Sequence, residues 1–317
     1  MTIMEIYEWE YSYANNKFEV QPNPPKEIPK SFFKYYALNR YSFDSIINQY
    51  IYAPHPSQLN DLFDCSMELF PIEDFSFLTE ILSDFDFKNK SEIEKKLKQE
   101  YCITKKFAET YFWERLYRTW GVLSLTDTND NVLMWSYYNQ HRGLCIEFDI
   151  KKFSFDYHGP FPINYQLELR PMKFKRENIA LQILLQCNLK NKRWKHENEW
   201  RIMVEKPQGT FMNSPNDIPQ LRKLSGHDRK FPYPIEAIKS ISLGNRFFEN
   251  NEIKEQNRNG CIIKLQSNFE QKSIILDFIS SNKILTHIGR KEGLNTISFT
   301  DSIIERINYK EYKINAC

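Results

Sequence analysis

The sequence is poor in glycine and lacks the glycine-based signatures of phosphate binding. Only nine of its 317 residues are glycine, and neither G-x-G-x-x-G nor G-x-x-x-x-G-K-[ST] occurs. The motifs G-x-S-x-G and H-E-x-x-H are absent as well. These absences remove the direct sequence evidence for a Rossmann dehydrogenase, a P-loop enzyme, a serine hydrolase or a zinc protease.

The sequence also lacks paired cysteines and an excess of charge of one sign. Its six cysteines are scattered without a C-x-x-C pair, which argues against a zinc site and against a secreted disulfide framework. The 43 Lys and Arg residues nearly balance the 41 Asp and Glu residues. No strong overall field therefore attracts nucleic acid or anionic lipid, and such a partner would need a local patch.

Targeting and membrane-spanning segments are missing from the sequence. The first ten residues are acidic and lack the basic start and apolar run of a secretory signal. No run approaches the roughly 18 apolar residues that would span a bilayer. We expect a cytoplasmic protein with no membrane partner, and the oligomeric state stays open.

The pattern of apolar residues and turn formers predicts an α+β fold with a mixed, partly antiparallel sheet, flanking helices and a helical insert. Residues 1–30 are polar and rich in proline near their end, so we expect an extended lead-in. Residues 31–317 are expected to form a single α+β domain, with the helical insert or lid at about 75–120. Strands are predicted at 31–36, 50–53, 121–126, 143–149, 200–204, 238–243, 261–265 and 295–299. Helices are predicted at 42–48, with Ser42 as N-cap, and at 132–139, 177–190 and 269–281.

Two tryptophan-containing segments, 131–149 and 194–201, place polar groups on elements that would otherwise be plain core. Because side chains two apart share one face of a strand, Glu197, Glu199 and Arg201 are expected on one side. Two carboxylates beside a guanidinium suit a site that orients a ribose hydroxyl or stabilises a cationic transition state. A solvated Glu/Arg edge with a cross-strand salt bridge is the competing interpretation, and both stay open.

Other polar residues allow a functional and a structural interpretation. His141 faces a cleft or caps carbonyl groups in a loop. Tyr137 and Tyr138 provide a stacking ring or ordinary packing. Lys34 and Tyr36 share one face of the first strand, where an exposed edge lysine is the default explanation.

Two connecting segments are also candidates for a functional role. The loop 57–64 carries several turn-forming side chains, and loops of this kind often border sites. The basic runs 173–176 and 190–193 are predicted to be solvated helix ends, with a nucleic-acid patch as the alternative.

The motifs in combination resemble the bacterial family called domain of unknown function 2971. The resemblance spans roughly residues 32–245, and the following segments carry it: Phe33-Lys-Tyr-Tyr36, Leu59-Asn-Asp61, Leu133-Met-Trp-Ser-Tyr-Tyr138, His141-Arg-Gly143, Phe148-Asp149, Trp194-x-x-Glu-x-Glu-Trp-Arg201 and Ile241-Ser-Leu-Gly244. Where that family has Asn-Asp-Pro-Phe-Glu, this chain has Asn60-Asp-Leu-Phe-Asp64.

The succession of elements is also similar in layout to ADP-ribosyltransferases, particularly those that modify DNA. By position, this resemblance implies that Lys34 or Tyr36 contacts the adenosine ribose of NAD. It implies that a ring of the Tyr137/Tyr138 pair stacks on nicotinamide. It also implies that Glu199, with Glu197 as its rival, holds the nicotinamide ribose. The transferases have His or Arg where this chain has Lys34. The remaining candidates for NAD binding are Ser124, His141 and Arg201.

Three functional hypotheses follow. The first is an NAD-dependent ADP-ribosyltransferase or NAD-consuming effector of bacterial defence, antiphage or toxin-like, that acts on nucleic acid or protein. The second is a non-catalytic sensor domain that binds a nucleotide or a protein motif. The third and weakest is a metal-dependent nuclease, for which Asp61, Asp64, Glu197 and Glu199 would supply oxygen ligands to magnesium.

Overall fold

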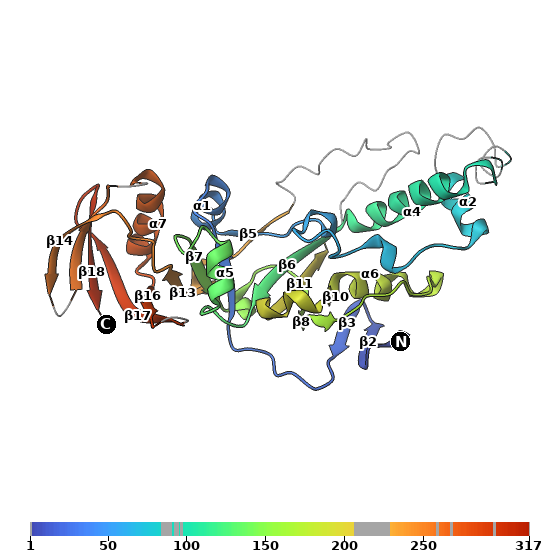
Figure 1. Cartoon of the computed structure of the whole chain (residues 1–317), viewed down its shortest axis with the longest axis horizontal. Helices are drawn as coiled ribbons and strands as arrows, with labels where there is room; N and C mark the ends of the chain where they lie inside the picture. Colours follow the sequence, from blue (N-terminus) through green and yellow to red (C-terminus); the bar gives the residue numbers. More distant parts are fainter. Residues whose placement is uncertain are drawn as a thin grey trace.

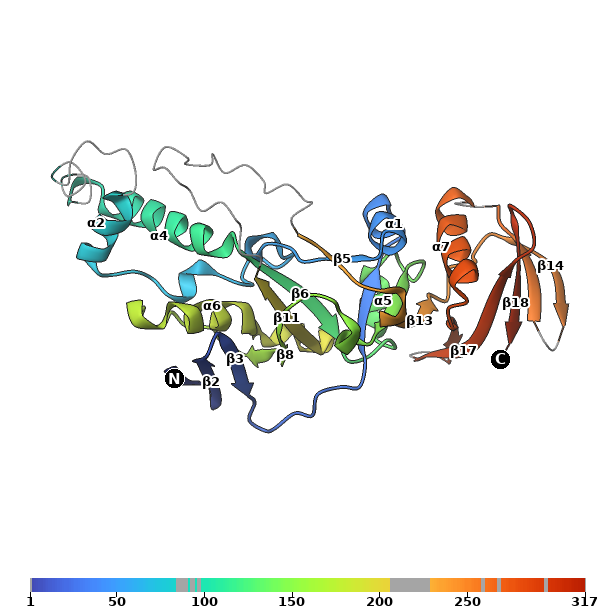
Figure 2. The ribbon, with the colours of Figure 1, turned by 180° about the vertical axis from the view of Figure 1, so that it is seen from behind.

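A mixed sheet of 11 strands forms the framework of an elongated molecule (Figure 1; Figure 2 shows the reverse side). The structure is a computed structural model and describes residues 2–83, 91, 95, 98–205, 229–257, 260–266, 269–293 and 296–316. Together with the helices that flank the sheet, this architecture confirms the predicted α+β class.

The strands of the large sheet do not follow their order in the chain. In space they run β14 (Glu252–Asn257), β15 (Gly260–Lys264), β18 (Glu311–Ala316), β17 (Thr296–Arg306), β16 (Thr286–Glu292), β13 (Ile238–Leu243), β7 (Leu144–Phe148), β4 (Phe32–Tyr36), β6 (Trp120–Thr126), β11 (Glu199–Glu205) and β8 (His158–Pro162). Strands β13 and β16 pair in parallel, and the other neighbours pair antiparallel. The sheet is therefore mixed and largely antiparallel. Two short two-stranded sheets accompany it, formed by β9 (Asn164–Gln166) with β10 (Leu189–Asn191) and by β5 (Tyr50–Tyr52) with β12 (Lys230–Pro232).

Helices lie on both faces of this framework. They are α1 (Arg40–Ile47), α2 (Phe75–Ser83), α4 (Tyr101–Tyr117), α5 (Val132–Tyr137), α6 (Ile179–Asn188) and α7 (Phe269–Asn282). Short 3-10 segments are η1 (Pro56–Gln58), η2 (Met67–Leu69), η3 (Ile150–Lys152), η4 (Arg176–Asn178), η5 (Lys192–Glu197) and η6 (Ile235–Ala237). Among the described residues, no helix combines the length and the apolar character needed to cross a bilayer.

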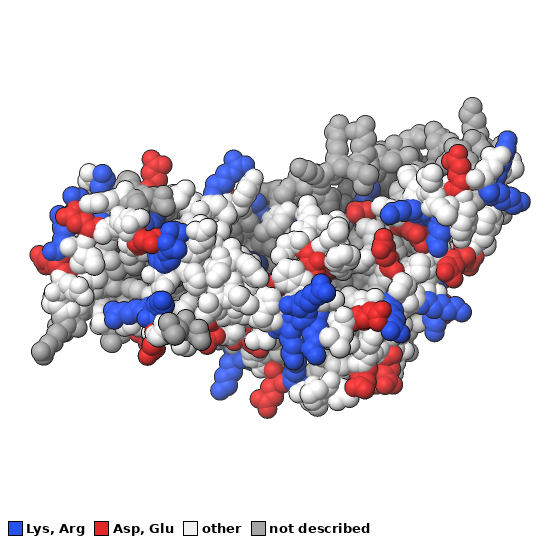
Figure 3. Space-filling model, in the orientation of Figure 1, with Lys and Arg blue, Asp and Glu red and all other residues white. Residues whose placement is uncertain are grey.

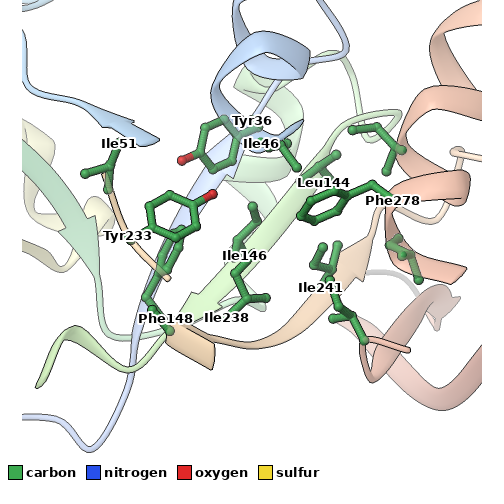
Figure 4. Close-up of a cluster of buried hydrophobic side chains, with 14 of the residues drawn as sticks. Tyr36, Ile46, Ile51, Leu144, Ile146, Phe148, Tyr233, Ile238, Ile241 and Phe278 are labelled. Carbon is green, nitrogen blue, oxygen red and sulfur yellow. The ribbon is translucent and has the colours of Figure 1, made fainter. Parts of the chain in front are cut away.

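The largest core lies between the sheet and helices α1 and α7. Tyr36 and Ile146 from neighbouring strands meet Ile46 of α1 and Phe278 of α7 in this core (Figure 4). On the opposite face, Trp135 of α5 is fully buried beside Tyr35 of β4, with ring centroids 5.1 Å apart. Burying a large apolar side chain contributes roughly 1.5–3 kcal/mol, so these contacts hold β4 and β7 firmly between two layers.

Helix α1 begins earlier than the sequence pattern indicates. Asn39, and not Ser42, is its N-cap, and the Asn39 side chain accepts the backbone N–H groups of Tyr41 and Ser42 at 3.0 Å. Ser42 is buried inside the helix. Asn and Ser are both common N-cap residues, and the prediction selected Ser42 where the helix uses Asn39, three positions earlier.

The expected lead-in at 1–30 is instead largely folded. Residues 2–21 form an antiparallel sheet of β1 (Thr2–Ile6), β2 (Trp9–Ala14) and β3 (Lys17–Gln21), and only the segment after it is extended. Tyr11 is fully buried, and its hydroxyl donates to Asn188 Oδ1 at 2.9 Å and accepts from Asn164 Nδ2 at 3.0 Å. The prolines break secondary structure only where they occur, after β3, and say nothing about the strands before them.

Helices α2 and α4 occupy the range of the predicted insert. They pack through aromatic rings, with the centroids of Phe77 and Phe112 5.3 Å apart. The middle of this range, residues 84–90 and most of 92–97, lies outside the described residues, and so does the first residue of the strand predicted at 295–299.

Candidate functional site

A cavity of about 280 Å³ lies where β4, β6 and β11 meet, beside α5 and the chain that follows β5. Gln58, Leu59, Asn60 and Asp64 supply part of its wall, so the loop 57–64 does border a cavity. The volume is just below the roughly 300 Å³ at the lower end of small-molecule pockets. It can enclose a nucleoside-sized group, whereas a whole dinucleotide would extend beyond it.

The cavity lies at a gap between strands β4 and β6. These two strands share one register pair, Phe33 with Thr126, whereas β4 and β7 share five. Lys34 reaches into the gap, and its ammonium group donates to the Ser124 carbonyl at 3.2 Å. Burial lowers the pKa of Lys34 to about 8, although the Glu199 charge opposes this shift. The lysine is therefore mostly charged at neutral pH and loses its proton more readily than an exposed lysine.

Strand β11 sorts its side chains onto two faces. Trp200, Ile202 and Val204 enter the main core, which confirms the prediction for these residues. Glu199 lies opposite Thr126 and Arg201 opposite Ser124 in the β6 register, and both project toward the cavity. Alternation along a strand thus brings the two charged side chains to one wall.

Glu197 is not on the strand, contrary to the prediction. It ends η5, and Asn198 then adopts a left-handed conformation with φ 45° before β11 begins at Glu199. This turn interrupts the two-residue alternation on which the prediction relied. Glu197 nevertheless lines the cavity, because the turn directs it back toward Lys190.

Arg201 is a fully engaged structural cation. Its Nη1 and Nη2 atoms donate to the two oxygens of Asp64 at 2.8 and 2.5 Å, and its Nε atom donates to Glu199 Oε1 at 2.7 Å. Nη1 also donates to the Cys187 carbonyl at 2.8 Å, and Nη2 to Glu199 Oε2 at 3.1 Å. These bonds use all five guanidinium N–H groups. The predicted role of Arg201 in binding NAD is therefore replaced by a positioning role toward Glu199.

Lys190 is the second cation of the cluster. Only 3% of its side chain is exposed, so the prediction of a solvated helix end at 190–193 is wrong for this residue. Its ammonium group lies 2.6 Å from Glu197 Oε2, 2.8 Å from Glu199 Oε2 and 3.5 Å from Asp64 Oδ2. Three carboxylates thus surround two buried cations, and removing one partner of such a pair typically costs about 3–5 kcal/mol.

The two glutamates have opposite pKa shifts. Burial raises the pKa of Glu199, but the charges and hydrogen bonds of Arg201 and Lys190 outweigh burial and bring this pKa down to about 2. For Glu197, burial and the neighbouring Glu199 charge prevail over Lys190 and raise the pKa. Glu199 is therefore ionised at neutral pH, whereas Glu197 takes up a proton more readily than an ordinary glutamate. Such a pair can divide the tasks of charge stabilisation and proton transfer.

One aromatic wall of the cavity is formed by Tyr138. Its ring is stacked on Tyr35 with centroids 5.6 Å apart, and burial, followed by the Glu197 and Glu199 charges, raises its pKa to about 12. Its neighbour Tyr137 is 59% exposed and does not line the cavity. Of the two tyrosines, only Tyr138 can present its ring to a ligand in the cavity.

Two other predicted site residues lie away from the cavity. Tyr36 is buried in the main core. His141 lies in the turn after α5, where its Nε2 atom is 3.1 Å from Ser136 Oγ and its carbonyl accepts the backbone N–H of Arg246. In this turn His141 has a structural role. The predicted residues that meet at the cavity are Lys34, Ser124, Tyr138, Glu197, Glu199 and Arg201.

Three residues of the site were not predicted as catalytic or NAD-binding, and Asp64 was named only as a magnesium ligand. Asp64 and Lys190 complete the charge cluster, and the Tyr165 hydroxyl accepts the Glu199 N–H at 2.9 Å. Asp64 lies in the Asn60–Asp64 motif that carries part of the family resemblance, so a signal for it existed. For Lys190 and Tyr165 no sequence pattern indicates burial.

The carboxylates do not form a metal site in the described part of the chain. No group of three or more His, Cys, Asp or Glu side chains there is arranged to hold a metal ion. Asp61 does not line the cavity, and the other three carboxylates already contact Lys190 or Arg201. The geometry therefore gives no support to the nuclease hypothesis.

Comparisons with protein-family models, curated proteins and solved structures give no match for this chain. The resemblance to the domain of unknown function 2971 family stays a prediction from the motifs.

Proposed function

We propose that the cavity binds the nicotinamide riboside half of NAD and that the protein breaks the bond between nicotinamide and ribose. The products would be free nicotinamide and ADP-ribose, which passes either to water or to a target molecule. The observation that carries this proposal is that Glu197, Glu199, Lys34 and Tyr138 line one cavity, in which the pKa of Glu199 is lowered and that of Glu197 is raised.

The bond changes assign different tasks to the two glutamates. The C–N bond to ribose breaks, and nicotinamide leaves as a neutral molecule with the bonding electron pair. Positive charge develops on the ribose, and the Glu199 carboxylate stabilises it in a site that is already organised. The acceptor oxygen or nitrogen then bonds to the ribose, and its proton passes to Glu197. A glutamate with a raised pKa is suited to that step.

Lys34 and Tyr138 would hold the substrate. The Lys34 ammonium uses one donor on Ser124, which leaves two N–H groups for a ribose hydroxyl or a phosphate. The Tyr138 ring provides an apolar face for the nicotinamide. Because the cavity suits only one half of NAD, the adenosine half would lie at its opening.

The sensor hypothesis has one observation in its favour. Glu199 already accepts hydrogen bonds from Arg201 and Lys190, as a purely structural carboxylate would. However, Glu199 Oε1 accepts only one of these bonds, from Arg201 Nε, and a carboxylate oxygen can accept two. That free position allows a ribose hydroxyl to bind.

The proposal is tested with Glu199→Gln, which keeps the shape of the side chain and removes its charge. We expect nicotinamide release from NAD to fall by about 10²–10³-fold, the usual effect of losing one electrostatic stabiliser of a transition state. The measurement is chromatography of nicotinamide, with and without nucleic-acid and protein acceptors.

The matched control is Glu147→Gln on strand β7 of the same sheet, where the carboxylate pairs with Lys239 outside the cavity. This variant should keep wild-type turnover. Thermal melting of both variants, with assays run well below the transition, separates lost chemistry from lost folding. Intact NAD in the wild-type reactions, or full turnover by Glu199→Gln, would refute the proposal.

A further inference from the structure

The segment η5 carries exposed cations up to the edge of the cavity. Lys192, Arg193 and Lys195 are exposed, and the segment ends at Glu197, which lines the cavity. Within the described residues these three side chains have no ion pair. In Figure 3, Lys and Arg side chains gather in a band near the lower centre of the face, where Figure 1 places β8 and β10. This band is a local excess of positive charge on a nearly neutral chain.

A fourth cation comes from the extended segment after β3. Burial lowers the pKa of Lys26, Asp127 raises it and Lys195 lowers it, so Lys26 lies close enough to feel both charges. Lys26 also lies 6.0 Å from the ring centre of Trp9. Lys26 thus adds a cation from a second segment to those of η5, with the Asp127 carboxylate near it.

Aromatic rings form a row beside these cations. The ring of Trp194 lies 6.1 Å from that of His196, which in turn lies 6.1 Å from the ring of Tyr137. The row ends next to Tyr138, the aromatic wall of the cavity. At its other end, the Lys190 ammonium lies 5.3 Å from the Trp194 ring centre, which links the row to the charge cluster.

We infer that this surface, formed by Lys26, Lys192, Arg193, Trp194, Lys195, His196 and Tyr137, binds single-stranded nucleic acid and leads one nucleotide to the cavity. Cations that follow a backbone and rings that stack on bases are the two elements of single-strand recognition. Bases within a duplex are already stacked on each other and cannot use such a row. An anionic bilayer would satisfy the cations but leave the rings without stacking partners.

The role of this strand as acceptor of ADP-ribose rests on the proposed function, whereas its binding does not. The test therefore measures binding without NAD. The probes are fluorescein-labelled DNA and RNA single strands of about 20 nucleotides, and vesicles with anionic lipid. Fluorescence anisotropy is recorded over a range of salt concentrations.

We expect the wild type to bind the single strands, with a plot of log K against log salt that falls by about 0.7 for each cation engaged. The triple variant Lys192→Ala/Arg193→Ala/Lys195→Ala should make this slope shallower by about 2. Tyr137→Ala should weaken binding by roughly five-fold or more through lost stacking. The matched control, Lys151→Ala/Lys152→Ala, removes two exposed cations of η3 and should change neither quantity.

Two outcomes would overturn the inference. One is equal binding and an equal salt slope for the wild type and the triple variant. The other is binding to anionic vesicles without binding to the single strands. Release of nicotinamide to water should be unchanged in the triple variant, because these cations do not line the cavity. A failed binding test with intact NAD cleavage would leave the proposed function standing, and the reverse result would leave the surface standing.

Discussion

At the scale of single residues, the molecule depends on a balance of buried charges. Asp64, Glu197 and Glu199 carry three negative charges, and Lys190 and Arg201 supply two buried positive charges. The protonated Lys34 ammonium at the cavity wall supplies a third positive charge. A bound phosphate would therefore favour the charged lysine, and a neutral lysine would leave an excess negative charge in the cavity.

The depressed pKa of Glu199 predicts how the free energy of unfolding changes with pH. Its folded value of about 2 lies below the ordinary value of 4.5, so its ionised form stabilises the fold above about pH 4.5. This contribution, roughly 3 kcal/mol, should be lost progressively as pH falls toward 2. Urea unfolding between about pH 6 and pH 3 should show a stability difference between wild type and Glu199→Gln that shrinks with acidification. A constant difference over this range would contradict the assigned ion pairs.

Part of this site could be predicted from local sequence. Strand alternation was enough to separate Glu199 and Arg201 from the core residue Trp200, because that rule needs only neighbouring positions. The burial of Lys190 could not be predicted, since it depends on carboxylates that the fold brings from residue 64, from the end of η5 and from the start of β11. The same limit applies to Glu197, for which a single left-handed residue, Asn198, altered the geometry.

At the scale of secondary-structure elements, several strands that face the core were predicted close to their observed bounds, whereas β8, β16 and β18 were not predicted. Strand β6 was expected at 121–126 and is Trp120–Thr126, and β13 was expected at 238–243 and has those bounds. Such strands have apolar runs that end in turn formers. Helix ends were less certain, because several residues near an end can cap it, as Asn39 and Ser42 illustrate.

The two candidate caps of α1 can be compared directly. We expect Asn39→Ala to cost about 1 kcal/mol, because two N–H groups of the first turn lose their acceptor. Ser42→Ala should cost clearly less, since no capping bond involves its side chain. Chemical unfolding of both variants under the same conditions is the measurement. A larger loss for Ser42→Ala would place the helix start at the position that the sequence suggested.

At the scale of the whole molecule, the amino-terminal sheet is an integral part of the fold. Trp9, Tyr11 and Phe18 bury their rings in the core that also contains α6 and the Met203 side chain of β11. The prediction missed this sheet although 11 of the first 21 residues are hydrophobic or aromatic, because it extended the proline-rich composition of 22–29 to the whole segment. The burial of Tyr11 itself has no local signature, since its hydrogen-bond partners lie more than 150 positions away.

Replacing Tyr11 tests how strongly this sheet is attached. In Tyr11→Phe the ring remains, but Asn188 Oδ1 and Asn164 Nδ2 lose their buried partner. We expect a loss of about 1–3 kcal/mol in the free energy of unfolding. The matched control is Tyr13→Phe on the same strand, where the hydroxyl bonds Asn16 at the surface and should matter by less than about 0.5 kcal/mol. Equal effects in the two variants would show that the network contributes little.

The gap between β4 and β6 gives the molecule a line of mechanical weakness. Of the neighbouring strands in the large sheet, this pair shares the fewest register pairs among the described residues, and the cavity lies along it. A force that twists the long axis would meet its least resistance there. A molecule bound across the gap would contact Lys34 on one side and Glu199 on the other. It would thereby connect the two strands where hydrogen bonds between them are lacking. Occupancy of the cavity would thus stiffen the whole sheet.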